Sequence, residues 1–256
     1  MILAIDIGNT NIVIGCIEER KCVFVERLST VRTKTELEYA IDIKSVLDIY
    51  HIRRDDLDGG IISSVVPEIT TVAKLAVEKI LKKEPLVVGA GIKTGLNIRI
   101  DNPAQLGSDL VVDSVAALAE YPAPMLIFDL GTANTECVID KNKNYIGGMI
   151  YPGIGVSLES LTAHASQLGG IGLEPPEHII GKNTVECMKS GTLYSAAAAI
   201  DGLVDRLCDE LEGDVTVIAT GGLAKKVVPY CRRKIILDDD LLLKGLAVIY
   251  RKNKKH

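Results

Sequence analysis

One short pattern occurs twice in the chain, and this repetition constrains the fold more than any other feature. "IDIGNTNIVIG" over residues 5–15 and "FDLGTANTECV" over residues 128–138 share the frame D-[IL]-G-[NT]-x-[NT]. Each copy joins an apolar run that ends at an aspartate, a turn that begins at a glycine, and a second run of strand-forming residues. Self-similarity of this kind indicates an internal duplication. The sequence therefore predicts two duplicated α/β lobes.

The predicted secondary structure follows the same order around both copies. Apolar and β-branched runs separated by Gly-Asn and by charged turns are typical of strands, and amphipathic runs of more than ten residues are typical of helices. Predicted strands cover residues 1–6, 11–18, 21–30, 59–66, 85–91, three segments within 125–155, and 214–222. Predicted helices cover residues 33–52, 67–83, 103–121, 185–207 and 239–252. We expect one lobe over residues 1–115 and the other over residues 116–256.

The helix predicted over residues 33–52 has a clear start signal. Thr35 precedes Glu36 and can cap the first turn, because a threonine side chain accepts a hydrogen bond from a free N–H at a helix start. The residues expected near one apolar face of this helix are Leu37, Ile41, Val46, Leu47 and Ile49.

Composition excludes several classes of protein. With 47% hydrophobic and 25% charged residues, the 256-residue chain is neither disordered nor fibrous, and with two Phe and no Trp its core is aliphatic. A net charge of −5 argues against nucleic-acid binding. No signal peptide and no apolar run of about 20 residues is present, so we expect a cytoplasmic protein with no membrane partner. The six cysteines form no C-x-x-C pair and are expected to be reduced.

The first turn has residue types that suit phosphate and metal. Gly8 lets the backbone approach a bulky anion, and Asn9, Thr10 and Asn11 supply amide, hydroxyl and backbone donors for phosphate oxygens. Asp6 can hold a hydrated Mg²⁺ through one carboxylate oxygen. An ordinary tight hairpin is the alternative for a single copy.

Two copies, together with a later "ATGG" at residues 219–222, favour nucleotide binding over the hairpin alternative. This layout resembles the superfamily of actin-like ATPases, sugar kinases and Hsp70-like ATPases. The resemblance implies two actin-like (ribonuclease H-like) lobes with mixed sheets and a nucleotide cleft between them. The chain has no G-x-x-x-x-G-K-[ST] motif, and the glycines of "GAGIKTG" at 89–95 have the wrong spacing for a dinucleotide site, so this segment is predicted to be a loop.

Several further blocks in the same order identify a narrower family. They are "DIGNTN" at 6–11, "DNPAQLGSD" at 101–109, "DLGTANT" at 129–135, "IGGMIYPG" at 146–153, "NTVECMKSG" at 183–191 and "ATGGLA" at 219–224. In these blocks the chain resembles the type III pantothenate kinases nearly from end to end. The resemblance implies ATP-dependent phosphorylation of pantothenate, the first step of coenzyme A biosynthesis, by a homodimer that uses Mg²⁺ and a monovalent cation, K⁺ or NH4⁺.

The resemblance also implies roles for individual residues. Asp109 corresponds to the catalytic base, Asp6 lies near the metal, and Asp129 corresponds to the ligand of the monovalent cation. ATP contacts carried over from the family are Asp6, Ile7, Gly8, Asn9, Thr10, Asn11, Ile12, Val13 and Thr132, with Gly221 and Gly222 in the glycine turn. Substrate contacts are expected at Ile100, Gly107, Ser108, Asp109, Leu110 and Thr184.

Two of these residues have a structural alternative. Asp109 can be merely an acid in a first helical turn, and Thr184 can cap the helix that follows it.

The chain departs from the family pattern at several of these positions. The usual G-A-D-R is "GSDL" here, so Leu110 replaces an arginine and offers no donor to an anion. Ile100 replaces a tyrosine, and Asn134, Glu136 and Cys137 replace a threonine, an aromatic residue and an acid.

Losing the charged hydrogen bond that an arginine at residue 110 would make to a bound anion costs about 1.5–3 kcal/mol. Neighbouring residues can offset a loss of this size, or it can reflect a different substrate, so three interpretations of the function stay open. The chain is a pantothenate kinase, a kinase for another small hydroxyl compound, or a nucleotide-binding relative with weak catalysis. Lys93 and Arg99 are candidates to replace the missing cation.

Overall fold

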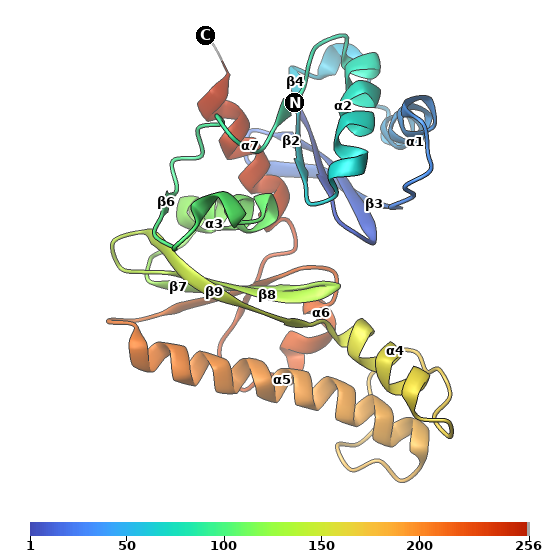
Figure 1. Ribbon diagram of the computed structural model, residues 1–256, viewed down its shortest axis with the longest axis vertical. Coiled ribbons are helices and arrows are strands. Elements are labelled where there is room, and N and C mark those ends of the chain that lie inside the picture. Colours follow the sequence, from blue (N-terminus) through green and yellow to red (C-terminus); the bar gives the residue numbers. More distant parts are fainter. Residues whose placement is uncertain (255–256) are drawn as a thin grey trace. The chain divides into compact units, whose positions relative to one another are not determined.

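The computed structural model describes residues 1–254, and in it the chain divides into two compact units (Figure 1). Unit 1 contains Met1–Leu96, Asp101–Glu120 and the chain from Asp240 onward, and unit 2 contains Asn97–Ile100 and Tyr121–Asp239. The C-terminal helix therefore belongs to the unit that contains the N-terminus. The two units are defined by contacts within the structure, whereas the predicted lobes are defined by the duplication in the sequence. The predicted lobe boundary between residues 115 and 116 therefore stays a prediction.

Unit 1 is built on a five-stranded mixed sheet with helices. Its strands are β1 (Ile2–Ile7), β2 (Asn11–Glu18), β3 (Lys21–Ser29), β4 (Gly59–Ser64) and β5 (Leu86–Val87). Its α-helices are α1 (Glu36–Ile49), α2 (Pro67–Leu81), α3 (Ser108–Glu120) and α7 (Leu241–Asn253), and its short 3₁₀ turns are η1 (Arg54–Asp56) and η2 (Pro103–Gln105).

Unit 2 contains a six-stranded mixed sheet. Its strands are β6 (Asn97–Ile98), β7 (Met125–Leu130), β8 (Ala133–Ile139), β9 (Asn144–Pro152), β10 (Thr216–Thr220) and β11 (Ile236–Leu237). Its helices are α4 (Ile154–His164), α5 (Thr184–Glu210), α6 (Ala224–Val227) and the 3₁₀ turn η3 (Val228–Tyr230).

The two sheets have the same topology, which confirms the duplication predicted from the repeated pattern. The order in unit 1 is β3-β2-β1-β4-β5, and the order β9-β8-β7-β10-β11 repeats it in unit 2, where β6 is added beside β9. In each sheet the first strand pairs antiparallel with the second and parallel with the fourth. Each aspartate of the repeated pattern therefore lies near the carboxyl end of a central strand.

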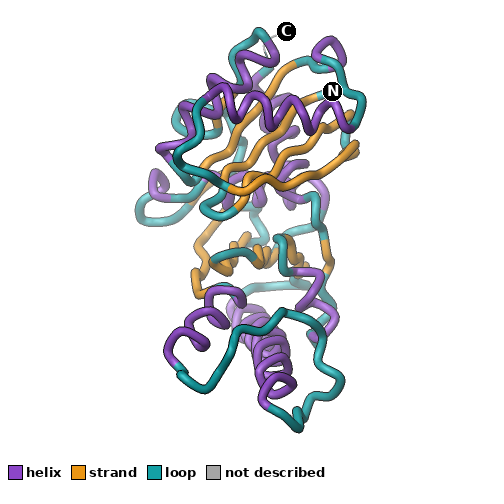
Figure 2. The backbone as a smooth tube through the Cα atoms, turned by 90° about the vertical axis from the view of Figure 1, so that its right-hand side faces the viewer, coloured by secondary structure: helices purple, strands orange, loops and turns teal. Residues whose placement is uncertain are grey.

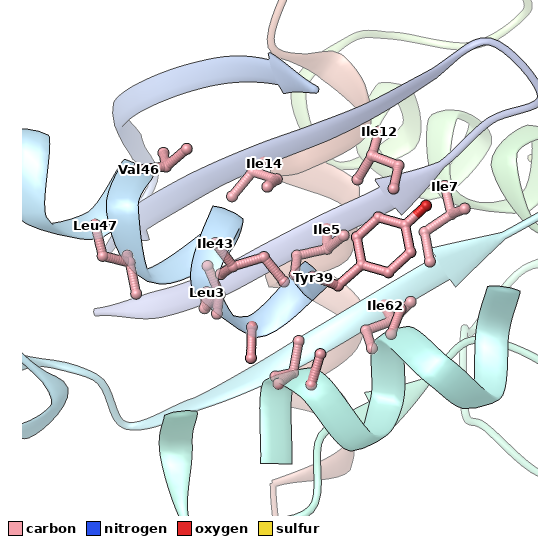
Figure 3. Close-up of a cluster of buried hydrophobic side chains, with 14 of the residues drawn as sticks. Leu3, Ile5, Ile7, Ile12, Ile14, Tyr39, Ile43, Val46, Leu47 and Ile62 are labelled. Carbon is pink, nitrogen blue, oxygen red and sulfur yellow. The ribbon is translucent and has the colours of Figure 1, made fainter. Parts of the chain in front are cut away.

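In unit 1, helices cover both faces of the sheet (Figure 2). On one face, Leu3, Ile5 and Ile7 of β1 pack with α1 and α2, and Tyr39 and Ile43 of α1 lie in this cluster (Figure 3). The other face packs against α7: a Cβ on the strand glycines Gly15 and Gly59 would lie 2.5 Å from Leu243 and 2.2 Å from Tyr250, respectively. These strands are therefore buried on both sides and almost wholly apolar.

The predicted apolar face of α1 is only partly correct. Val46 and Leu47 are buried, but Leu37, Ile41 and Ile49 are 59%, 56% and 70% exposed. The buried positions are Tyr39, Ala40, Ile43, Val46 and Leu47, which follow the helical spacing from Tyr39 instead of Leu37. The predicted cap is confirmed, because Thr35 and Glu38 form a reciprocal capping box.

The core of unit 2 lies between its sheet and α5. Leu126, Phe128 and Leu130 of β7 pack with Leu193 and Ala197 of α5. Figure 1 shows α5 running along this sheet. The helix begins one residue before the range predicted for it, and its N-cap is Asn183, whose side chain accepts a hydrogen bond from the backbone N–H of Glu186 at 3.0 Å. Thr184 is the first residue of the helix, so its predicted alternative role as the cap is wrong.

The predicted elements otherwise differ from the observed ones mainly at their ends. The strand predicted over residues 85–91 is reduced to Leu86–Val87, and "GAGIKTG" is a loop as predicted. The helix predicted over residues 103–121 begins at Ser108, after the 3₁₀ turn η2. All six cysteines are free thiols. Among the described residues, no helix has the length and apolar character needed to cross a membrane.

Candidate functional site

The first repeated turn joins β1 and β2 at the carboxyl end of β1. Asp6 is 8% exposed and is paired in register with Val13 on β2 and Ser63 on β4. The N–H of Gly8 donates to the carbonyl of Asn11 at 3.0 Å, and a Cβ on Gly8 would lie 3.1 Å from that same oxygen. A side chain at residue 8 would therefore crowd the turn, which explains the glycine.

The end of β3 fixes this turn from outside. The hydroxyl of Thr30 donates to the carbonyl of Gly8 at 2.7 Å, and the N–H of Thr30 donates to the carbonyl of Thr10 at 3.0 Å. Because two backbone oxygens of the turn are engaged in this way, its conformation is set by the chain itself.

Arg32 is a residue of this region that the sequence analysis missed. Its guanidinium donates to the side-chain oxygen of Asn9 at 3.3 Å and forms an ion pair with Glu68 at 3.1 Å. The guanidinium is half exposed and has further N–H groups available to an anion. No sequence motif distinguishes an arginine that follows a strand, so Arg32 could be identified as a candidate site residue only from its contact with Asn9 in the structure.

Asp109 lies in the first turn of α3, where the sequence analysis expected it. Burial raises the pKa of its carboxyl above the ordinary value, and the N–H of Leu110 opposes this by donating to Oδ1 at 2.9 Å. The neighbouring Ser108 contacts the end of β4, with its hydroxyl 3.0 Å from that of Ser63. Since Ser63 pairs with Asp6, the predicted metal residue and the predicted base belong to the same end of the unit 1 sheet.

Two positions where the chain departs from the family pattern, residues 110 and 100, have apolar side chains. The two cations considered as replacements, Lys93 and Arg99, have other contacts. Leu110 is buried and offers no donor to an anion. Ile100 belongs to unit 2 and is half-buried. The backbone of Lys93 exchanges two hydrogen bonds with the side chain of Asn253 in α7. Arg99 lies in unit 2, near Asp140. Burial acts to raise the pKa of Asp140, but hydrogen bonds from Asn144 and Asn142, and then the charge of Arg99, lower it overall.

The second repeated turn is one residue shorter than the first. Leu130 pairs with Asn134, and the N–H of Gly131 donates to the carbonyl of Ala133 at 3.3 Å. The backbone of Gly153, at the start of α4, packs against this turn. The N–H of Gly153 donates to the carbonyl of Thr132 at 3.0 Å, and a Cβ there would lie 2.2 Å from the carbonyl of Gly131.

The predicted glycine turn meets this second turn inside unit 2. Gly221 follows β10 with a φ of +94°, and a Cβ there would lie 2.2 Å from Oδ1 of Asp129. The next turn residue, Gly222, has open space around its Cβ position. The structure therefore brings Asp129, Gly131 and Gly221 together, and Gly221 must be a glycine for reasons of both space and backbone angle.

Glu136 is buried in the core of unit 2, although it was noted only as a departure from the family pattern. It is 1% exposed, neither carboxylate oxygen has a hydrogen-bond partner within residues 1–254, and burial raises its pKa to about 7. The nearby Tyr151, which is opposite Asn134, has a pKa of about 12 because of burial first and the charge of Glu136 second.

A cavity of about 780 Å³ lies in unit 2 beside α4 and α5. The predicted substrate residue Thr184 lines it, together with Asn134 and Tyr151 from the sheet. Its other walls include Ile154 and Met188, so most of the lining is apolar. A cavity of this size and character suits a small organic molecule with a few polar groups.

The carboxylate of Asp6 suits a hydrated metal ion, one that keeps water molecules among its ligands. Among the described residues, no group of three or more His, Cys, Asp or Glu side chains could hold an ion by itself. Mg²⁺ commonly binds through one or two carboxylates plus phosphate and water, and the single carboxylate of Asp6, beside the first turn, fits that mode.

The fold belongs to a known class of α/β proteins. The chain is similar to an activator of 2-hydroxyisocaproyl-CoA dehydratase from Clostridium difficile, solved with bound ADPNP, with a TM-score of 0.57, 13% identity, and coverage of 99% of this chain and 98% of that one. With two mixed sheets of one topology, the architecture is that of the actin-like ATPases and sugar kinases, as predicted.

The family follows from the sequence comparisons. The model of the type III pantothenate kinase family matches residues 2–206. A type III pantothenate kinase from Exiguobacterium sp. is 44% identical over 100% of both chains, and one from Bacillus cytotoxicus is 45% identical over 99% of this chain and 97% of its own. The chain belongs to the type III pantothenate kinase family, which confirms the resemblance found in its motifs.

Proposed function

We propose that this protein phosphorylates pantothenate at the expense of ATP, the first step of coenzyme A biosynthesis. Family membership over the full length supports the activity. The single observation that carries the assignment of the site is the link from Asp6 through Ser63 and Ser108 to Asp109. It supports the proposal because Asp109, the proposed base, and the turn that we propose binds phosphate lie at the same end of the unit 1 sheet.

In the proposed reaction, Asp109 accepts the proton of the pantothenate hydroxyl as that oxygen attacks the γ-phosphorus of ATP. The bond from the γ-phosphorus to the β,γ-bridging oxygen breaks, and ADP leaves. Phosphoryl transfer needs positioning and charge neutralisation more than covalent chemistry. The backbone donors from Asp6 to Val13 would hold phosphate oxygens, and the free N–H groups of Arg32 would add positive charge next to Asn9.

The remaining contacts are proposals of the same kind. Mg²⁺, held by Asp6, would neutralise phosphate charge. Thr132 would contact the nucleotide, Gly221 and Gly222 would receive its adenosine, and Asp129 would hold K⁺ or NH4⁺. The backbone N–H groups at the start of α3, near Gly107, would bind the pantothenate.

We further propose a cytoplasmic homodimer. Thr184 would contact the substrate at the cavity beside α5, in agreement with its place in the lining. The net charge of −5 supports the absence of a nucleic-acid partner.

One observation favours a second candidate, a kinase of the same fold that acts on a different small hydroxyl compound. Leu110 is buried and cannot supply the charged donor that an arginine would direct at a carboxylate. A substrate without a carboxylate would not need that donor. Glu136, Cys137 and Ile100 do not by themselves favour either substrate. A weakly catalytic nucleotide-binding relative is the third outcome of the experiment below.

The test is ADP release that depends on pantothenate, with Mg²⁺ and K⁺ present. Asp109→Asn is expected to lower kcat by a factor of about 10² to 10⁴, the usual contribution of a general base. Asp55→Asn, a change of an exposed aspartate in unit 1, is the matched control and should leave kcat unchanged.

Wild-type protein that is stabilised by ATP in a thermal melt but releases no ADP would refute the kinase proposal. ADP release that needs another hydroxyl compound would establish the second candidate. Recovery of turnover with pantothenate in Leu110→Arg alone would identify the third.

A further inference from the structure

Ser108 was expected to contact the substrate, but its hydroxyl is engaged inside unit 1. Its Oγ lies 3.0 Å from Oγ of Ser63, accepts a hydrogen bond from the N–H of Ser64 at 3.2 Å, and donates to the carbonyl of Ser64 at 3.0 Å. A hydroxyl has one hydrogen to donate and two lone pairs. With Ser63 as the second donor, all three are used, so the side chain of Ser108 has no hydrogen bond left for a ligand.

Ser63 and Ser64, the residues at the end of β4 that Ser108 contacts, are themselves held in place. The hydroxyl of Ser64 accepts from the N–H of Val66 at 3.2 Å and from the hydroxyl of Thr70 at 2.8 Å. Ser63 is fully buried, so its hydroxyl cannot exchange its partner for water. The end of β4 is therefore a rigid point of attachment.

This attachment lies between two parts of the proposed site. Ser63 and Ser64 are paired in register with Asp6 and Ile7, the last residues of β1 before the phosphate turn. On the other side, Ser108 is the first residue of α3, and Asp109 follows it directly. The hydroxyl therefore fixes the first turn of α3 to the strand end that carries Asp6.

The rest of α3 is held separately. A Cβ on Gly245 of α7 would lie 2.2 Å from the backbone oxygen of Val112, so the two helices touch through their backbones. That contact holds α3 at its second turn, and the hydrogen bonds of Ser108 hold its first residue.

We infer that Ser108 is a positioning residue for Asp109: its hydroxyl holds the first turn of α3 so that the carboxylate meets the hydroxyl of the substrate in a reactive geometry. This inference rests on the proposed function of Asp109. It assigns the side chain of Ser108 to the protein instead of the substrate, and any substrate contact of this residue is made by its backbone N–H.

The test compares Ser108→Ala with Ser114→Ala. Ser114 is a fully buried serine of the same helix whose hydroxyl has no hydrogen-bond partner in the part of the chain described, which makes it a matched control. Ser108→Ala is expected to lower kcat about tenfold, while KM for pantothenate changes by less than about twofold, because a positioning residue acts on the transition state. Ser114→Ala should leave both constants unchanged.

A double-mutant cycle gives a second prediction. Ser63→Ala removes one of the three hydrogen bonds of the Ser108 hydroxyl, so the double variant should be no slower than Ser108→Ala alone. A rise in KM with unchanged kcat in Ser108→Ala would mean that the hydroxyl binds substrate, and additive losses in the cycle would mean that the two serines act separately. Either result overturns the inference.

Two further measurements separate this inference from the proposed function. If Asp109→Asn keeps wild-type kcat, the proposed base is wrong, and the inference is wrong with it. If the wild type does not act on pantothenate, hydrogen exchange of the amides of residues 109–111 still tests the attachment. Faster exchange in Ser108→Ala than in Ser114→Ala supports it, and equal exchange overturns it.

Discussion

Replacing Glu136 with glutamine should change how the stability of unit 2 depends on pH. Glu136 lies on β8, where it is paired in register with Phe128 on β7 and Met149 on β9, and its side chain is almost completely buried. Neither oxygen has a hydrogen-bond partner within the described residues, and burial is the cause that raises its pKa from 4.5 to about 7. Glutamine has nearly the same shape but cannot ionise.

The sign and size of the effect follow from proton linkage. Between pH 4.5 and about 7 the folded protein keeps a proton that the unfolded chain has lost, so its stability falls as the pH rises through this window. At about 1.4 kcal/mol for each pH unit, the full loss is about 3 kcal/mol and is complete above the folded pKa. Tyr151, the titratable neighbour, keeps its proton over this range because its own pKa is about 12.

The measurement is the melting temperature of wild type and Glu136→Gln from pH 4.5 to 8.5. The two curves should run together at the acid end and separate by about 6 to 12 °C at pH 8, with the variant more stable, since about 2 to 4 °C corresponds to 1 kcal/mol in a chain of this size. Glu210→Gln, a change of an exposed glutamate in α5, should give a constant difference. A constant difference for Glu136→Gln as well would refute the reasoning.

Two other changes test the local geometry. Gly221→Ala places a methyl group 2.2 Å from Oδ1 of Asp129 at a φ of +94°, so it should cost about 1 to 3 kcal/mol and weaken nucleotide binding, whereas Gly222→Ala meets open space and should be tolerated. Melting curves and ATP titration measure both, and equal behaviour of the two variants would contradict the prediction. Thr35→Ala breaks the capping box with Glu38 and should cost about 1 kcal/mol in a denaturant titration, while Thr35→Ser should restore most of the loss.

Local signals account for the parts of the fold that were predicted. The repeated D-x-G pattern led to two sheets of one topology, because an apolar run before a glycine turn has few alternatives to a buried strand. Thr35 and Pro67 marked helix starts correctly, since a cap and a first-turn proline act within one turn of the chain. Asp109 was found only through the family motif, because an acid in a first helical turn is common.

The remaining features depend on the partners that the fold supplies. The two-residue strands β6 and β11 are too short to have a period of their own and exist because β9 and β10 offer free edges. The buried face of α1 was misjudged because Tyr39, a polar-tipped residue, is its anchor, with its hydroxyl exchanging hydrogen bonds with the backbone of Val31. Likewise, Arg32 reaches Asn9 only after β3 has returned to the first turn.

The departures from the family pattern separate by their physical consequences. Leu110 and Cys137 are buried apolar side chains, so the cores of their units accept them, and at the proposed substrate site we expect a change of Leu110 to act on substrate binding. Glu136 is the reverse case, an ionisable group placed where the family has an aromatic residue, and its cost falls on stability above its pKa. A change at residue 110 should therefore alter KM without altering the pH dependence of unfolding. A change at residue 136 should alter the pH dependence of unfolding without altering KM. Because the two effects act on different measurements, the substrate question and the stability question can be answered independently.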